Sequence, residues 1–128
     1  MLGLMTPDEF PTIRGYAPPF KRSDIDPYTL EDALATLDGD GTPEGHGGHR
    51  HGSFRGKNEF PAGWDEYDVQ RWTNGIIDHP QMYDPADDGV NIYGTSGGVE
   101  GVVMVRTNWG IIYVATGFPC DMVSWPRG

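Results

Sequence analysis

Three short runs rich in β-branched and aromatic residues lie in the C-terminal part of this chain, with glycine-containing turns between them. The runs are residues 90–93, 99–106 and 111–116, and the turns are residues 94–98 and 107–110. Such side chains favour strands, and turns of this kind join neighbouring antiparallel strands. The C-terminal part of the chain is therefore predicted to form an antiparallel sheet whose strands are joined by hairpin turns.

The first of two predicted helices begins after Thr29. Leu30, Leu34 and Leu37 recur at helical spacing. Thr29 is a suitable N-cap, and Asp32 follows three residues later. The turn-forming residues 38–41 end the helix.

The second predicted helix begins after Asp65 and ends before Pro80, because proline cannot continue a helix. Its apolar positions fall on a single face and are expected in the core: Val69, Trp72, Ile76 and Ile77. With the sheet, the two helices predict an α+β domain in which N-terminal helices pack on a C-terminal antiparallel sheet.

Composition along the chain predicts the domain organisation. Residues 1–27 hold five prolines and no sustained period, and we expect an extended arm or linker that lies across the domain. Residues 28–128 form the domain itself. Within it, residues 81–89 are expected to form a polar loop whose acidic cluster is solvated surface.

The charge balance limits the classes of partner. Nineteen acidic and nine basic residues give a formal net charge of −10, whereas proteins that grip long nucleic acids are usually basic. Residues 46–57 contain no carboxylate and could contact a few nucleotides. The single cysteine excludes an intramolecular disulfide. No membrane-spanning run and no signal peptide are recognisable, so export would need another signal, as in a larger parent protein.

A glycine-rich segment, residues 45–61, contains three of the four histidines and a lysine. Histidine exchanges protons near neutral pH, and lysine supplies a fixed positive charge. Glycines let backbone amides approach a bound anion. Proton transfer beside anion stabilisation is what phosphodiester cleavage requires.

Three ordered motifs resemble the bacterial EndoU nuclease family. They are Gly-His-Arg-His-Gly at 48–52, Gly-Lys-Asn-Glu-Phe-Pro at 56–61 with Trp64 after it, and Thr-Gly-Phe-Pro at 116–119. The family pattern is similar to Gly-His-x-His-Gly, then Gly-Lys-(Ser/Thr)-Glu-Phe-Pro-x-x-Trp, then Thr-(Gly/Ala)-Tyr-Pro. The resemblance covers residues 30–120.

The resemblance implies a ribonuclease toxin with the barnase/EndoU/colicin/RelE-like fold. Such domains end larger secreted proteins of contact-dependent inhibition and polymorphic toxin systems, are delivered into the cytoplasm of a target bacterium, and are neutralised by a cognate immunity protein. The implied chemistry needs no metal or other cofactor. A 2′-hydroxyl of RNA, typically tRNA at a uridine, attacks its own phosphate and leaves a 2′,3′-cyclic phosphate. DNA lacks this hydroxyl and is not expected to be cut, and no membrane partner is expected.

Roles carried over from the family fall on matching positions. His49 would act as one acid/base, and His51 could share or replace that role. Lys57 would stabilise the phosphate charge, and Thr116 would donate a hydrogen bond. The predicted contacts to substrate are Gly48, Arg50, Arg55 and Phe118.

Two positions depart from the family pattern. Family members carry an earlier histidine in a segment resembling His-Ile-Leu-x-Gly-Asp, where this chain has Ala35 in the segment 35–40. Either His46 has taken that role, or the chain is an inactive relative or an inactivated toxin. Phe118 replaces a tyrosine, which keeps a stacking surface and removes one hydrogen bond.

Two other functions use the same residues or a different surface. His46, His49 and His51 with Asp38 or Asp40 could bind zinc, although their spacing is irregular. Alternatively, the domain is a catalytically inactive binding module that holds a protein partner through its aromatic residues, Tyr93, Trp109 and Trp125.

Overall fold

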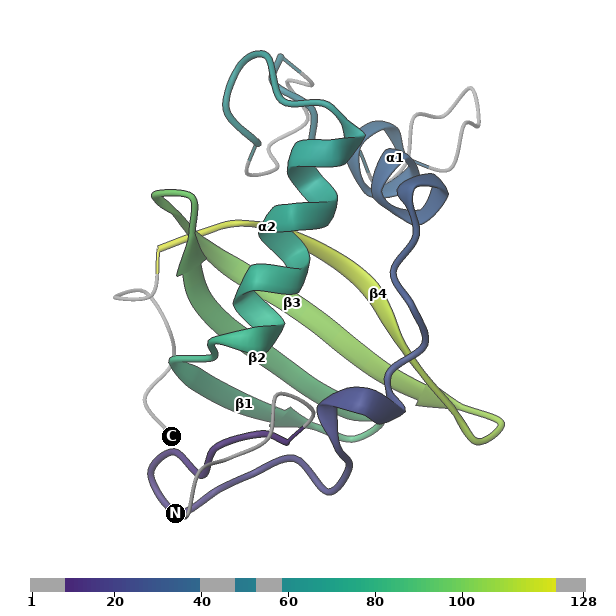
Figure 1. The fold of residues 1–128 in the computed structure, drawn as a ribbon, viewed down its shortest axis with the longest axis vertical. Helices are drawn as coiled ribbons and strands as arrows, with labels where there is room; N and C mark the ends of the chain where they lie inside the picture. Colours follow the sequence, from purple (N-terminus) through teal and green to yellow (C-terminus); the bar gives the residue numbers. More distant parts are fainter. Residues whose placement is uncertain (1–8, 40–47, 53–58, 122–128) are drawn as a thin grey trace.

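In the described part of the computed structural model, two α-helices and a short 3-10 helix precede a four-stranded sheet (Figure 1). The structure describes residues 9–39, 48–52 and 59–121. All neighbouring strands are antiparallel, in the order β1-β2-β3-β4, which confirms the α+β class. The elements are η1 (Arg22–Asp24), α1 (Leu30–Asp38), α2 (Glu66–Asp78), β1 (Met82–Ala86), β2 (Gly89–Ser96), β3 (Val99–Asn108) and β4 (Ile111–Pro119).

Helix α1 begins directly after Thr29, the N-cap that the sequence predicts. The Thr29 hydroxyl accepts a hydrogen bond from the Asp32 amide at 3.1 Å, and the Asp32 carboxylate accepts one from the Thr29 amide at 3.0 Å. Ala33 and Leu37 are fully buried, whereas Leu34 is 40% exposed. The buried face of α1 therefore includes Leu37 but not Leu34.

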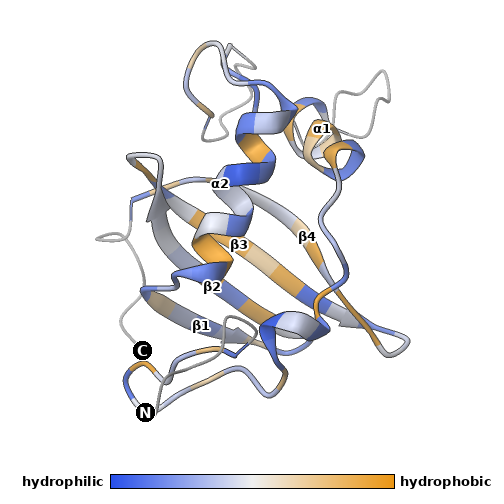
Figure 2. Cartoon of the chain, viewed as in Figure 1, coloured by the Kyte–Doolittle hydropathy of each residue, from blue (hydrophilic) through white to orange (hydrophobic). Residues whose placement is uncertain are grey.

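Helix α2 supplies the largest part of the core. The predicted N-cap Asp65 is confirmed, and all four predicted core residues are at most 1% exposed: Val69, Trp72, Ile76 and Ile77. Figure 2 shows the hydrophobic part of α2 lying over the hydrophobic middle of the sheet. Neither described α-helix has the length and apolar content needed to cross a bilayer.

The prediction of a polar loop over residues 81–89 is wrong. Met82–Ala86 forms β1, which pairs with β2 from Met82↔Tyr93 to Ala86↔Gly89. Pro85 is tolerated because β1 is an edge strand. Tyr83 packs against the core, and its hydroxyl donates to the Pro11 carbonyl at 2.7 Å, so contacts distant in sequence decide this strand.

Both hairpin turns are tighter than the predicted turn segments. The β2–β3 turn consists of Gly97 and Gly98, with φ of 59° and 79°, and the β3–β4 turn consists of Trp109 and Gly110, with φ of 55° and 78°. Two-residue turns with positive φ at both positions match the twist of paired strands. The strands therefore extend beyond the predicted runs, and β4 continues to Pro119.

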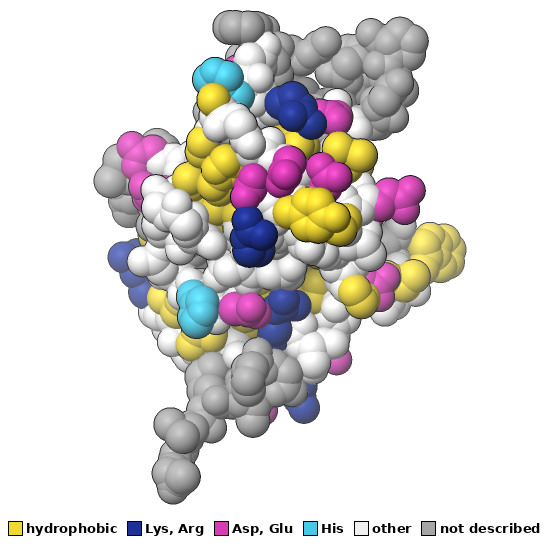
Figure 3. Space-filling model, turned by 45° about the horizontal axis from the view of Figure 1, so that its top comes forward, with side chains coloured by type: hydrophobic (Ala, Val, Ile, Leu, Met, Phe, Trp, Pro, Cys, Tyr) yellow, Lys and Arg dark blue, Asp and Glu magenta, His cyan; other side chains and the backbone are white. Residues whose placement is uncertain are grey.

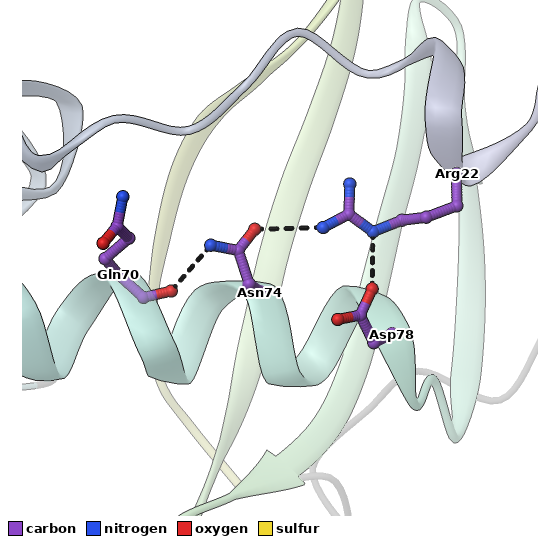
Figure 4. A network of polar contacts seen from close by, with 4 residues as sticks. All are labelled: Arg22, Gln70, Asn74 and Asp78. Atoms are coloured by element: carbon purple, nitrogen blue, oxygen red, sulfur yellow. Dashed lines mark hydrogen bonds and ion pairs between the residues drawn. The ribbon is translucent and has the colours of Figure 1, made fainter. Parts of the chain in front are cut away.

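The described part of the predicted arm, residues 9–27, packs on the domain. Ile25 is 5% exposed and forms a parallel bridge with Ile112 of β4. The Arg22 guanidinium donates to Asp78 at 2.7 Å and to the Asn74 side chain at 3.0 Å, as Figure 4 shows. These contacts fasten the arm to the outer side of α2 and make it part of the folded unit.

Candidate active site

The segment 48–52 is fixed against the end of α1. The His49 and Arg50 amides donate to the Leu37 carbonyl at 2.9 and 2.8 Å, which satisfies a carbonyl at the helix C-terminus. A Cβ atom on Gly48 would lie 2.7 Å from the Asp38 backbone carbon, so a side chain there would displace the segment. The predicted contact residue Gly48 thus has a clear structural reason to be glycine.

The His49 side chain meets the last strand. It is only 7% exposed, and its ring stacks on Phe118 with centroids 4.8 Å apart and planes at 25°. The Phe60 ring meets the His49 ring edge-on at 6.5 Å, and the Phe60 amide donates to the His49 carbonyl at 2.8 Å. The fold therefore brings together two motifs that are far apart in sequence.

Thr116 lies on the same face of β4 as Phe118. A Cβ atom on Gly117, between them, would point at the Trp72 ring of α2 at 3.3 Å, so the alternation of a strand places Thr116 and Phe118 on the opposite face. Thr116 pairs with Met104 beside a bulge in the β3–β4 ladder. Bulges often occur next to active sites, where they redirect side chains.

His51 differs from His49 in its surroundings. Its side chain is 62% exposed, and its Nδ1 lies 3.8 Å from the Glu59 carboxylate. The same carboxylate accepts a hydrogen bond from the Gly52 amide at 2.9 Å, which holds it beside the segment. Glu59 belongs to the Gly-Lys-Asn-Glu-Phe-Pro motif, and its contact with Gly52 is a feature of the tertiary structure.

Arg50 is paired with a helix residue. Its Nε donates to Asp38 at 2.5 Å, and this bond raises the pKa of the Arg50 guanidinium. Both side chains are about half exposed, at 48% and 45%, so the ion pair can open at little cost for another anion. Figure 3 shows basic side chains interspersed with acidic ones on the face drawn there.

Ala35 lies on the exposed side of α1. The buried side of this helix comprises Ala33, Thr36 and Leu37. Ala35 and Asp38 are three residues apart and share a helix face, and Asp38 is the partner of Arg50. A larger side chain at position 35 would therefore lie near the 48–52 segment without entering the core.

Several predicted residues lie outside the described part of the chain, namely Asp40, His46, Arg55, Lys57 and Trp125. Within residues 9–39, 48–52 and 59–121, no three His, Cys, Asp or Glu side chains gather as a metal site would need. Of the proposed zinc ligands that the structure describes, Asp38 pairs with Arg50, His49 stacks on Phe118, and His51 lies beside Glu59.

Cys120, next to the end of β4, is expected to react slowly. Burial, and then the nearby Glu100 and Asp121 carboxylates, raise the pKa of its thiol to about 11. At pH 8 the thiolate fraction is about 100-fold below that of a free cysteine; the greater nucleophilicity of such a thiolate offsets part of this, leaving a rate about tenfold lower. The rate at which Cys120 reacts with a chromogenic disulfide is measured for the folded chain and, as a control, for the urea-unfolded chain. Equal reaction rates for the folded and the unfolded chain would contradict the burial of Cys120.

Comparison with known protein families, with curated proteins and with solved structures gives no significant match.

Proposed function

We propose that this chain is a metal-independent endoribonuclease domain of a bacterial toxin, with the barnase/EndoU/colicin/RelE-like fold. The observation that supports the proposal most strongly is the stack of His49 on Phe118, at a centroid distance of 4.8 Å. It joins the histidine motif to the Thr-Gly-Phe-Pro motif, which share a site in the EndoU family that the sequence resembles.

The described side chains fit the requirements of RNA transesterification. In this reaction the O2′–P bond forms and the P–O5′ bond breaks, while one group removes the 2′ proton and another protonates the leaving 5′ oxygen. His51 is open to solvent beside the Glu59 carboxylate and can exchange protons with a bulky substrate. His49 stacks on Phe118 and is the second candidate acid/base. The Thr116 hydroxyl is a donor for the phosphate.

Ala35 is the position that limits activity under this proposal. Replacing Ala35 by histidine adds an acid/base group on the helix face beside Arg50, and a positioned group of this kind contributes about 100-fold or more in rate. We therefore expect Ala35→His to cleave total tRNA in the presence of EDTA at least about 100-fold faster than the unaltered chain. Gel analysis of the fragments, with detection of 2′,3′-cyclic phosphate ends, measures the gain.

Matched reactions separate this proposal from its rivals. Leu34→His places a histidine on the next exposed position of α1 and should leave the rate unchanged. Single-stranded DNA should remain intact in every reaction, because it has no 2′-hydroxyl. Absence of RNA cleavage by both the unaltered chain and Ala35→His would favour an inactive binding module. Cleavage that requires added zinc would favour the metal site instead.

The proposal also specifies biological partners. A toxin that cuts tRNA in the target cytoplasm needs a cognate immunity protein in the cell that makes it, and delivery by a larger protein. Expression of Ala35→His in the bacterial cytoplasm is expected to stop growth, whereas the unaltered chain is tolerated better.

A further inference from the structure

The tip of the β3–β4 hairpin carries a large apolar side chain into solvent. Trp109 is 93% exposed, and Ile111, two residues later, is 51% exposed. Figure 1 shows this hairpin extending beyond the rest of the domain. Single exposed apolar residues are common on protein surfaces, so exposure alone carries no conclusion.

The backbone at the tip gives a second, independent observation. Trp109 has a φ of 55° and Gly110 one of 78°. Two-residue turns of this type strongly prefer asparagine, aspartate or glycine at the first position, and a bulky residue there is strained. The residue preferences of this turn type therefore do not explain why tryptophan occupies position 109. Strain that a fold retains at an exposed point is a reason to look for a function.

Acidic residues lie on both sides of the hairpin near its tip. The Asp88 carbonyl accepts a hydrogen bond from the Thr107 amide at 2.6 Å. This bond places the exposed residues Asp87 and Asp88 beside the hairpin. Arg106, the cation nearest in sequence, already pairs with Asp88 at 3.3 Å. On the other side of the hairpin, Asp26 donates its amide to the Ile112 carbonyl at 2.7 Å.

A cavity of about 270 Å³ lies at the base of the same surface. Asp26 and Asp32 line it from the arm and from α1, and Ile111 and Tyr113 line it from β4. Two carboxylates with an aromatic ring and an aliphatic wall suit a lysine or arginine side chain, whose stem is apolar and whose head is charged.

We propose that this surface, the hairpin-tip surface formed by Trp109, Ile111, Asp26, Asp32, Asp87 and Asp88, docks a protein with an apolar pocket rimmed by lysine or arginine. Trp109 enters the partner's pocket as an anchor, and a basic side chain of the partner enters the cavity between Asp26 and Asp32. Aromatic anchors of this kind supply much of the affinity of protein interfaces. The carboxylates repel RNA phosphates and anionic lipid headgroups, which favours a protein over either.

Along β4, the hairpin tip is distant from Phe118 of the candidate active site, whereas Asp32 of the hairpin-tip surface lies three residues before Ala35 on α1. Phe118 lies seven residues beyond Ile111 on β4, and a rise of about 3.3 Å per residue separates them by about 23 Å. A small contact at the tip therefore leaves the His49 region uncovered. The inference does not depend on ribonuclease activity, since a chain without activity would keep the same tip.

The test uses Trp109→Asn, which places Asn-Gly in the turn. Because this pair suits the turn, we expect the full chain to fold and its melting temperature to rise. A lower melting temperature would show that Trp109 serves the fold and would overturn the proposal.

Binding is measured with a partner found by photo-crosslinking. A photoreactive phenylalanine replaces Trp109 in the cells that naturally make the chain, and Tyr67 on α2, 54% exposed, takes the same label as control. The crosslinked protein is then purified and titrated against the unaltered chain, Trp109→Asn and Asp26→Asn/Asp32→Asn. We expect at least a 30-fold loss of affinity for Trp109→Asn, a smaller loss for the Asp variant, and weaker binding at high salt.

Each other outcome counts against the proposal. One such outcome is that Trp109→Asn binds the partner as tightly as the unaltered chain does. The others are a crosslinked adduct that forms equally from position 67, the absence of any adduct, and an adduct with RNA. Retention of the chain on phosphatidylcholine vesicles, lost in Trp109→Asn, would assign the tip to a lipid surface. Concentration-dependent dimerisation lost in the same variant would assign it to a second copy of the chain.

Discussion

Replacing His49 by alanine is expected to abolish RNA cleavage in whichever background cleaves, the unaltered chain or Ala35→His. Loss of a positioned acid/base group lowers the rate by about 10² to 10⁴. The substitution also removes the ring that stacks on Phe118 at 4.8 Å, and with it a contact between the 48–52 segment and β4. Initial rates on total tRNA, with binding measured separately, determine which step is affected.

The matched control for this change is His49→Phe. Phenylalanine keeps an aromatic ring against Phe118 and Phe60 but has no nitrogen to exchange a proton, so the fold should be retained while cleavage is lost. His51→Ala is the companion variant, because His51 is 62% exposed and its removal should cost little stability. If His49→Phe cleaves RNA at the original rate, His49 is a packing residue, and the assignment of proton transfer to it is wrong.

Replacing Trp72 by alanine is expected to bring the domain close to unfolding. Trp72 is 1% exposed, its ring meets Phe60 edge-on at 5.1 Å, and its indole N–H donates to the Val99 carbonyl at 2.9 Å. Truncating a buried tryptophan costs about 3–5 kcal/mol through lost burial and the cavity that remains. A small domain has only about 5–15 kcal/mol in total. Urea unfolding followed by circular dichroism measures the loss.

Strands β3 and β4 leave space for the Trp72 ring, so the loss of stability on truncation is specific to this position. A Cβ on Gly101 would lie 2.5 Å from the indole ring and one on Gly117 would lie 3.3 Å from it, so β3 and β4 each present a glycine to it. Tyr67→Ala on the same helix is the control, since Tyr67 is 54% exposed and its loss should cost about 0.5 kcal/mol. Similar midpoints for the two variants would contradict this description of the core.

The two helices were predictable because their signals are local. The caps Thr29 and Asp65 lie directly before the residues that they cap, and the apolar face of α2 is complete within one segment. The β-branched runs similarly predicted β2, β3 and β4. Their ends were less predictable, because cross-strand hydrogen bonds extend β4 as far as Pro119.

Strand β1 and the role of Glu59 were missed for the opposite reason. Residues 82–86 contain an aspartate and a proline and have weak strand preference, but pairing with β2 and the contact of Tyr83 with Pro11 stabilise the strand. Glu59 accepts a hydrogen bond from Gly52, seven residues earlier, and no sequence pattern predicts that contact. The motif at 56–61 indicated that Glu59 lies near the candidate site, but it did not indicate the partner of Glu59.

From its sequence alone, this protein is determined to be an α+β domain with two capped helices, an antiparallel sheet and a histidine-rich segment, because propensity, capping and periodicity act between near neighbours. Only the tertiary structure decided that His49 is buried against Phe118 while His51 stays in solvent beside Glu59. It also decided that Trp109 stands exposed at a strained turn. Burial and contact between distant segments depend on how the whole chain packs, which local preferences do not encode.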